Sequence, residues 1–289
     1  MLFNKINKFL KRFNNIEKKL DLIQGALGRI EERQIKDEDI ANAEYKVFSQ
    51  WGEDGIIQYL VNNLKISKKV FIEFGVENYT ESNTRFLLVN NNWSGLVIDG
   101  SEKNINYIKQ DEIYWRYNLK AECSFITAEN INDIFKKNGI QGNIGILSID
   151  IDGNDYWVWN SINSVNPAII TCEYNHRFGK EKAVTVPYDA RFVRKEKHYS
   201  CIYYGASIKA LVLLGQKKGY SLVAGNSNGN NIFFVRNDLL NDRVKPKTVD
   251  DVFVHAQFRE SRNEDGSLAF LNLEKEKKIL EKLELVDVE

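Results

Sequence analysis

Strand-like and helix-like segments alternate from residue 54 to residue 235, and this alternation constrains the fold more than any other feature of the chain. Short runs rich in β-branched and aromatic residues are separated by amphipathic stretches of helical periodicity. Regular alternation of this kind indicates a parallel sheet with helices on both faces. We therefore predict an α/β fold: a Rossmann-like, doubly wound, mostly parallel sheet of seven strands.

The turn chemistry near the end of this region predicts one departure from parallel pairing. The predicted strands are 70–74, 95–98, 124–127, 144–149, 168–172, 220–224 and 231–235, and the predicted helices are 54–64, 82–91, 104–109, 131–137, 156–161, 207–218 and 273–285. The last two strands are separated by 225–230, whose sequence GNSNGN is typical of a hairpin. We therefore expect an antiparallel last strand.

Bulk composition fits one large globular domain with an appendage. The chain has 289 residues, 43% of them hydrophobic, which is enough to bury a full core. Its 40 basic residues balance 40 acidic ones, so the net charge gives no support for a nucleic-acid partner. The three cysteines lack metal-binding spacing, and neither a membrane-spanning run nor a signal-peptide core is apparent. We expect a cytoplasmic protein.

An amphipathic heptad helix is predicted over residues 1–34, for oligomerisation or docking. Its apolar residues recur at alternating steps of four and three: Leu2, Ile6, Phe9, Phe13, Ile16, Leu20, Ile23, Leu27 and Ile30. We favour a homo-oligomer over packing of this stripe on its own domain. Contact with a membrane is the third alternative, because the first half of the helix is basic. The polar residues 34–44 are predicted to link this helix to the domain 45–289.

The end of the first predicted strand is acidic and poor in glycine. In an open α/β sheet, ligands bind beyond the carboxyl ends of the strands. A dinucleotide site places a glycine-rich turn there, so that pyrophosphate can rest on a helix N-terminus. Here Gly75 is alone between Glu73 and Glu77, whose carboxylates would repel a phosphate. Such a turn suits a cationic ligand, such as the ammonium and sulfonium of S-adenosylmethionine.

Asp99 ends the second predicted strand and is followed by Ser101 in the next turn. An acidic residue at this place commonly accepts hydrogen bonds from ribose hydroxyls in Rossmann-like folds. An aspartate at the end of a strand also commonly caps the next helix, and that alternative stays open. Because Asp99 occurs at the expected spacing after Glu73, we favour the cofactor role.

Four short motifs together resemble a known family. The motifs are SQWGEDG at 49–55, FIEFG at 71–75 with SNT at 82–84, GLVIDG at 95–100 and SIDIDG at 148–153. In order and spacing they are similar to those of class I S-adenosylmethionine-dependent methyltransferases of the FkbM-like type, many of which occur in bacterial glycan and antibiotic clusters. The resemblance covers roughly residues 45–236, most of one domain.

The resemblance implies a cofactor site and its contacts. It implies that Glu73 and Gly75 contact the methionyl part of S-adenosylmethionine, that Ser82 and Asn83 bind its carboxylate, and that Asp99 holds the ribose. It implies further that the segment around Thr127, Ala128 and Glu129 borders the adenine. With Ser101 and Asp150, these residues form the predicted cofactor set. Glu77 and Asn78 depart from the glycine-rich first loop that is commonest in the family.

Oxygen-bearing side chains follow the fourth and fifth predicted strands. Asp150 and Asp152 share a face because they are two residues apart, and Glu173 and Asn175 lie opposite on the neighbouring strand. Such ligands suit Mg²⁺, Mn²⁺ or Ca²⁺, which could hold adjacent hydroxyls and lower the pKa of one. Equally, this segment could be a turn in which Asp150 caps the next helix. Without a metal, Asp150 or Asp152 would hold the acceptor hydroxyl.

A hydroxyl that attacks a methyl group needs a base to take its proton. We name His176 first, because it follows the acidic end of the fifth strand, and His198 second. The long segment 177–204 is predicted to cover the acceptor. Its arginines, Arg191 and Arg194 among them, could bind the diphosphate of a carrier sugar or be solvated loop charges.

These features predict an O-methyltransferase that acts on a hydroxyl of a sugar or sugar nucleotide, in surface polysaccharide (capsule) or other glycan biosynthesis. Two alternatives remain. One keeps the chemistry but takes a small phenol or a phosphoryl-linked acceptor. The other is a non-catalytic partner that keeps the fold and oligomerises through the N-terminal helix.

Overall fold

The computed structural model describes residues 2–35 and 39–289, without the side chains of residues 2–5, 7, 8, 10, 11, 13, 14 and 17. The predicted seam positions Leu2 and Phe13 therefore lie outside the described side chains, and part of the predicted linker, 36–38, lies outside the described residues. Across the described ranges, no helix combines the length and the apolar character needed to cross a membrane.

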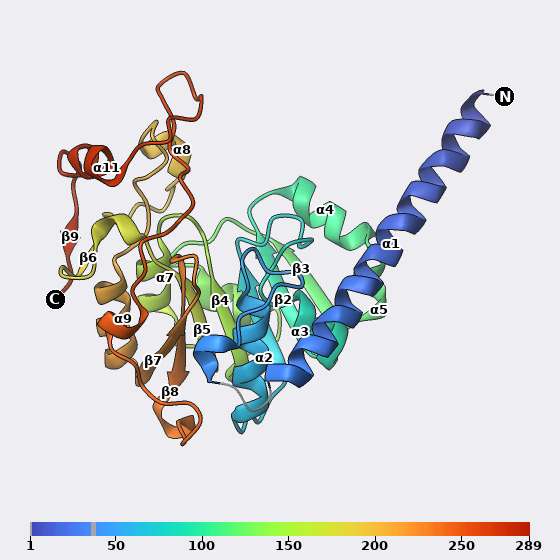
Figure 1. Ribbon diagram of the computed structural model, residues 1–289, viewed down its shortest axis with the longest axis horizontal. Helices are drawn as coiled ribbons and strands as arrows, with labels where there is room; N and C mark the ends of the chain where they lie inside the picture. Colours follow the sequence, from blue (N-terminus) through green and yellow to red (C-terminus); the bar gives the residue numbers. More distant parts are fainter. Residues whose placement is uncertain (1, 36–38) are drawn as a thin grey trace.

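Seven strands form one sheet in the order β3-β2-β1-β4-β5-β8-β7 (Figure 1). Their bounds are β1 Val70–Phe74, β2 Ser94–Asp99, β3 Leu119–Cys123, β4 Gly142–Ile149, β5 Val165–Glu173, β7 Tyr220–Gly225 and β8 Asn231–Arg236. Strands β1 to β5 pair in parallel, whereas β8 runs antiparallel to both β5 and β7. The predicted fold, including the antiparallel last strand of this sheet, is confirmed.

Helices cover both faces of the sheet, because successive side chains of a strand point to opposite sides. Ile72 packs in a cluster with α6 (Ile131–Lys137), α7 (Asp155–Ser161) and α9 (Ile208–Lys217). Phe71 packs in a second cluster on the other face, with α2 (Glu53–Asn63), α3 (Arg85–Asn91), α4 (Glu102–Gln110) and α5 (Glu112–Arg116). The order of the strands reverses between β1 and β4, and their carboxyl ends open a crevice for a ligand.

The C-terminal part of the chain packs on the segment that follows β5. The segment after β5 contains β6 Val184–Thr185 and α8 Arg194–Lys197, and the C-terminal part contains α10 Val249–Val252, α11 Leu273–Leu280 and β9 Val286–Asp287. Strands β6 and β9 pair in a separate antiparallel sheet. Arg177 Nε lies 2.9 Å from Glu276 Oε1, and both side chains are buried. Loss of either partner would leave a buried charge without its counter-charge, which is strongly destabilising. The ion pair therefore ties α11 to the segment after β5.

The third strand lies earlier than predicted, at Leu119–Cys123 instead of 124–127. Its exposed Lys120 breaks up the apolar pattern, because β3 is an edge strand of the sheet. The residues predicted as a strand form a loop that Asn130 fastens: its side chain accepts a hydrogen bond from the Thr127 amide and donates one to the Phe125 carbonyl. This loop borders the pocket described below.

Helix α1 (Leu2–Gln34) extends from the domain, and its C-terminal end lies against α2 and α3 (Figure 1). The predicted apolar stripe does not face the domain. Leu20, Ile23, Leu27 and Ile30 are each at least 50% exposed. Packing of the stripe on its own domain, one of the alternatives weighed from the sequence, is therefore wrong for these positions.

Candidate active site

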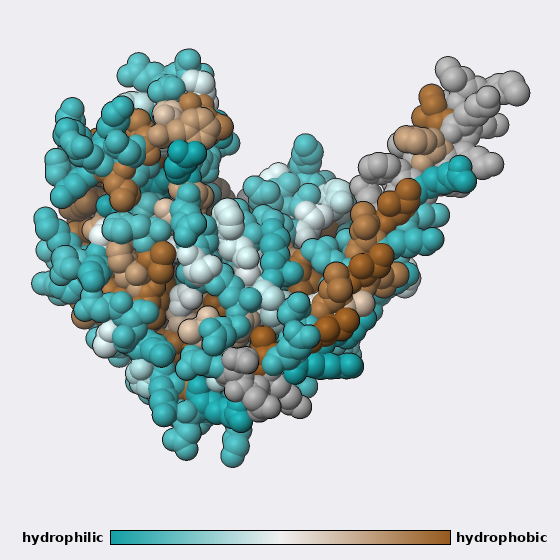
Figure 2. Space-filling view, in the orientation of Figure 1, coloured by the Kyte–Doolittle hydropathy of each residue, from teal (hydrophilic) through white to brown (hydrophobic). Residues whose placement is uncertain are grey.

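A pocket of about 660 Å³ opens at the carboxyl ends of β1, β2, β4 and β5. It falls within the usual size range of small-molecule sites in proteins. In Figure 2 the surface is hollowed between the part that carries α8 and α11 and the part that carries α4. The lining includes six residues predicted to bind the cofactor, namely Glu73, Gly75, Ser82, Asn83, Asp99 and Asp150. Asp150 was also predicted as a metal ligand, and the predicted ligands Asp152 and Glu173 line the pocket as well.

Gly75 brings the end of β1 against the end of β4. Its φ is +77°, and a Cβ atom at this position would lie 1.6 Å from the carbonyl oxygen of Asp150. Only glycine combines that backbone conformation with so close an approach. The single glycine of the acidic turn is thus required by the packing of the two strand ends that form the floor of the pocket.

Glu73 is 5% exposed and fastens the turn that follows β1. One carboxylate oxygen accepts a hydrogen bond from the Asn83 amide at 2.9 Å, and the other accepts from the Thr84 amide at 3.0 Å and its hydroxyl at 2.5 Å. Burial raises the pKa of Glu73, and the hydrogen bonds with Thr84 and Asn83 partly offset that rise. The residue therefore organises the 82–84 turn while also lining the pocket.

Asp99 connects the turns that follow β1 and β2. Its Oδ2 accepts from the Glu77 amide at 2.9 Å, and its Oδ1 accepts from the Ser101 amide at 2.8 Å and from Asn104 Nδ2 at 3.0 Å. The cap of α4 is Ser101, whose hydroxyl accepts from the Asn104 amide. The N-cap of α4 is therefore Ser101. Asp99 instead joins the two turns that form this wall of the pocket.

The predicted adenine segment lies just beyond the pocket. The pocket is lined in this region by Ser124, Phe125 and Ile126. Its lining does not include the predicted residues Thr127, Ala128, Glu129 and Ser101. The discrepancy follows from the position of β3, which ends four residues before the end of the strand predicted at 124–127. The predicted segment 127–129 therefore lies three residues too far along the same loop.

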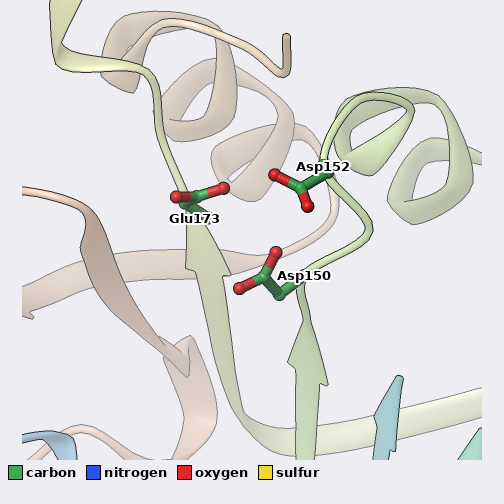
Figure 3. A group of neighbouring side chains, drawn as sticks. All are labelled: Asp150, Asp152 and Glu173. Atoms are coloured by element: carbon green, nitrogen blue, oxygen red, sulfur yellow. The ribbon is translucent and has the colours of Figure 1, made fainter. Parts of the chain in front are cut away.

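Three carboxylates converge on the other side of the pocket (Figure 3). Asp150 directly follows β4, Glu173 ends β5, and Asp152 lies in the turn before α7. One oxygen atom of each lies within 4.8 Å of the others, and Glu173 is only 8% exposed. The structure brings together three of the four predicted metal ligands.

Burial and nearby like charges shift the pKa values of two of these acids, Asp150 and Glu173. Burial and the neighbouring carboxylates raise the pKa of Asp150 well above its ordinary value. Burial and Asp152 likewise raise the pKa of Glu173, to about 8. Arg194 supplies a counter-charge, since its Nη1 lies 2.5 Å from Asp152 Oδ1. A carboxyl group whose pKa lies near neutrality can accept a proton in a reaction at physiological pH.

The turn after β4 is held by Asp155 and not by Asp150. Asp155 Oδ1 accepts from the Ile151 amide and Oδ2 from the Gly153 amide, both at 2.9 Å. The alternative in which Asp150 caps the following helix is therefore wrong, because Asp155 accepts those amide hydrogens and leaves Asp150 among the lining residues of the pocket.

The remaining predicted residues lie outside the pocket lining. Asn175 donates to the carbonyls of Ile202 and Tyr204 and accepts from the Arg177 amide, so its side chain fixes the covering segment. His176 is 2% exposed, and burial lowers its pKa to about 3. His198 Nδ1 pairs with the Ser200 hydroxyl at 2.6 Å. The structure brings neither histidine to the acidic cluster.

The segment 177–204 contributes two residues to the pocket lining. Phe192 and Arg194 line the pocket, and Phe192 packs so closely on Gly153 that a Cβ atom there would lie 2.2 Å from its ring. Tyr188 reaches across to the loop after β3, where its hydroxyl accepts from the Ala128 amide and donates to Glu129. Ala128 and Glu129, which were predicted to border the adenine, thus bind the segment 177–204 through Tyr188.

Trp51 and Phe258 add an aromatic wall that could not be assigned from the sequence. Their rings stack with centroids 6.3 Å apart, and both residues line the pocket. Glu53 fixes the loop of Trp51: its carboxylate accepts from the Trp51 amide and from the side chains of Asn226 and Asn231. Trp51 belongs to the motif at 49–55, which was the one available signal, whereas nothing near Phe258 marked it.

Models of protein families and curated protein sequences give no match to this chain. Among solved structures, the N-terminal domain of EvdMO1 with SAH bound has a TM-score of 0.44 at 12% identity, over 75% of this chain and 96% of that one. An S-adenosylmethionine-dependent methyltransferase from Clostridium acetobutylicum has a TM-score of 0.40 at 9% identity, over 64% and 90% of the two chains. Strand order and pocket geometry, rather than these matches, support the assignment below.

Proposed function

We propose that the protein is an S-adenosylmethionine-dependent O-methyltransferase that acts on a hydroxyl of a sugar or sugar nucleotide, in surface polysaccharide or other glycan biosynthesis. One observation carries this proposal. A single pocket joins the acidic, glycine-poor ends of β1 and β2 to the cluster of Asp150, Asp152 and Glu173. The first region suits a cationic nucleoside ligand, and the second suits the removal of a proton.

The donor end of the pocket supports S-adenosylmethionine over a dinucleotide. The carboxylates of Glu73 and Glu77 line the pocket on either side of Gly75, where a pyrophosphate would meet like charge. The pocket continues to Asp99 and then to Phe125, a sequence of surfaces that matches amino acid, ribose and base. We assign Ser82 and Asn83, which also line the pocket, to the amino-acid end.

The acceptor end supports attack by a hydroxyl. We assign proton acceptance to Glu173 rather than to either predicted histidine, because Glu173 lines the pocket and its pKa is raised to about 8. The hydroxyl oxygen bonds to the methyl carbon as the carbon–sulfur bond breaks. The sulfonium becomes a neutral thioether, and the hydroxyl proton passes to the Glu173 carboxylate. Positioning of the two reactants would contribute most of the rate enhancement.

The acidic cluster also fits a divalent cation. Its donors are carboxylate oxygens, the ligands that Mg²⁺ and Mn²⁺ prefer, and their mutual repulsion is visible in the raised pKa values of Asp150 and Glu173. Asp150, Asp152 and Glu173 would hold the ion, which would lower the pKa of an acceptor hydroxyl when bound; Glu173 would then act as a ligand instead of as the proton acceptor. Arg194 already supplies one positive charge to Asp152.

The aromatic wall and its polar neighbours favour a carbohydrate as the acceptor. Trp51 and Phe258 offer ring faces, while Asn230, Asn231 and Glu260 line the pocket with amide and carboxylate groups. A sugar has both an apolar face and a rim of hydroxyls, which such a mixture of groups can bind. Resemblance of the motifs to the FkbM-like type points to the same class of acceptor.

Methylation of nucleotide sugars tests this function directly. The full-length protein would be incubated with S-adenosylmethionine and a panel of nucleotide sugars, and products carrying one added methyl group would be sought by mass spectrometry. We expect at least one methylated product. Full activity in chelator would exclude the metal, whereas activity that is lost in chelator and restored by Mg²⁺ or Mn²⁺ would establish it. No product from any nucleotide sugar, together with methylation of a phenol, would overturn the carbohydrate assignment.

A further inference from the structure

Helix α1 carries an apolar stripe that the rest of the domain leaves exposed. Figure 2 shows this stripe running along the helix. Its described side chains, with exposed fractions between 47% and 66%, are Ile6, Phe9, Ile16, Leu20, Ile23, Leu27 and Ile30. Apolar side chains in a regular row of this length are stabilised by a partner surface.

The opposite side of α1 is the one that contacts the domain. At Gly28 a Cβ atom would lie 2.5 Å from Val47 and 2.9 Å from the Phe86 ring. The Glu32 carboxylate accepts from the side chains of Asn62 and Asn90, at 3.0 and 3.1 Å. Helix α1 thus contacts the domain through Gly28 and Glu32, and the apolar stripe does not take part in this contact.

The spacing of the stripe identifies the kind of partner. Ile6, Leu20 and Leu27 occupy the a positions of a heptad repeat, and Ile16, Ile23 and Ile30 the d positions. A strict seven-residue repeat drifts around a straight helix, so it stays in contact only with a partner that supercoils with it. A membrane surface would instead select a wide apolar face. Coiled-coil pairing is the packing that this pattern fits.

The attachment of the domain leaves room for such a partner. In the same heptad repeat, Gly28 is at b and Glu32 is at f, the two positions that face outward in a coiled coil. Asp21, which lies 3.7 Å from Arg85 of the domain, is also at b. Gln24, at e, also donates to the Val47 carbonyl. The domain therefore occupies the b, e and f side of α1, and the a and d side chains from Leu20 to Ile30 stay exposed.

We propose that α1 assembles three or four copies of this chain into a parallel coiled coil. The choice of apolar residues favours more than two strands. In the half of α1 nearest the domain, leucine stands at a (Leu20, Leu27) and isoleucine at d (Ile16, Ile23, Ile30). Leucine at a with isoleucine at d shifts parallel coiled coils from dimers toward trimers and tetramers.

Charge favours the parallel orientation. The g positions include the cations Arg12, Lys19 and Arg33, whereas the e positions 17, 24 and 31 carry Glu, Gln and Glu. Antiparallel helices place g residues opposite g residues, which would bring these cations together. Parallel helices place each g residue opposite the e residue five positions later, which pairs Arg12 with Glu17 and brings no two of these cations together. The occupant of the seam is therefore a further copy of the same helix, pointing the same way.

The mass of the full-length protein in solution tests the assembly. By sedimentation equilibrium at micromolar concentration, we expect three or four times the chain mass of 33.5 kDa. The double variant Leu20→Glu/Leu27→Glu should sediment as a monomer with an unchanged melting temperature, because both side chains are exposed in the single chain. Leu22→Glu is the matched control: Leu22 is 71% exposed but at position c, and this variant should keep the wild-type mass.

Two results would overturn the assembly. One is a monomeric wild type, which would require another occupant; binding of that monomer to anionic vesicles would identify a membrane surface. The other is dissociation by Leu22→Glu to the same extent as by the double variant.

Disulfide crosslinking tests the orientation of the helices. In a Cys123→Ser background, which removes the one exposed cysteine, Ile30→Cys should form disulfide-linked pairs of chains under mild oxidation. A parallel bundle brings equal positions together, so mixing Ile6→Cys chains with Ile30→Cys chains should give no crosslink between the two kinds. Crosslinking of Ile6→Cys to Ile30→Cys in place of like pairs would contradict the parallel arrangement.

Discussion

Glu173→Gln is expected to lower kcat for methyl transfer by about 10²- to 10⁴-fold, the contribution that a positioned base makes to a proton-transfer step. The substitution keeps the shape of the side chain and removes its ability to accept the proton. Glu173 lines the pocket beside Asp150 and Asp152 at the end of β5, whereas Asp99 ends β2, from which β1 and β4 separate β5 in the sheet. The affinity for S-adenosylhomocysteine, measured by calorimetry, should therefore stay within a few-fold of the wild-type value.

The pH dependence of the same reaction gives a second readout. Burial and Asp152 raise the pKa of Glu173 to about 8, and only its ionised form accepts a proton. For the wild type, kcat should therefore rise with pH through the neutral range and level off above that pKa. The residual rate of Glu173→Gln should lack this rise. A variant that kept both the rate within tenfold and the pH profile would assign the proton to another group.

Gly75→Ala is expected to reduce the free energy of unfolding by about 4 kcal/mol or more, among the largest effects of single substitutions. The alanine Cβ would lie 1.6 Å from the carbonyl oxygen of Asp150, at a backbone φ of +77°. Because the clash is with backbone atoms, relief requires the ends of β1 and β4 to separate. Urea denaturation of the variant measures the loss, and its affinity for S-adenosylhomocysteine should fall as well.

Gly142→Ala separates the clash from the backbone strain. Gly142 has nearly the same φ, +70°, but no atom lies within 4 Å of a Cβ placed there. This control should cost only the left-handed conformation, about 1–2 kcal/mol. Equal losses for the two variants would mean that the approach of Gly75 to Asp150 contributes nothing to the pocket floor.

The sheet could be predicted because its strands are buried on both faces. Runs such as Val70–Phe74 and Gly142–Ile149 are apolar through most of their length, and the covering helices are amphipathic. The edge strand β3 was not placed correctly, because Lys120 and Glu122 interrupt the apolar pattern of its sequence. The short pairing of β6 with β9 joins residues about a hundred positions apart, and no local pattern encodes such a contact.

Residues of the pocket lining could be predicted where they stand at the end of a strand. Glu73, Gly75, Asp99, Asp150 and Glu173 were chosen in this way, and all of them line the pocket, while their roles stay predictions. Trp51 and Phe258 meet across some two hundred residues of chain, so their stacking is a property of the tertiary structure alone.

The predicted base illustrates the same limit. His176 follows the acidic end of β5, and position alone made it a candidate. Packing decides otherwise, because the chain turns after Glu173 and places the imidazole against Phe258 and His255 with 2% exposure. Loss of solvent lowers its pKa to about 3, whereas the same burial raises the pKa of Glu173 toward neutrality.

Calorimetric titration of the full-length protein with S-adenosylhomocysteine tests the central assignment most directly, since it requires no knowledge of the acceptor. We predict one binding site per chain, at least tenfold weaker binding in Asp99→Ala because the Glu77 and Ser101 amides lose their acceptor, and no binding of NAD. The absence of any heat of binding with S-adenosylhomocysteine, or tighter binding of NAD, would contradict the assignment of this pocket to a methyltransferase.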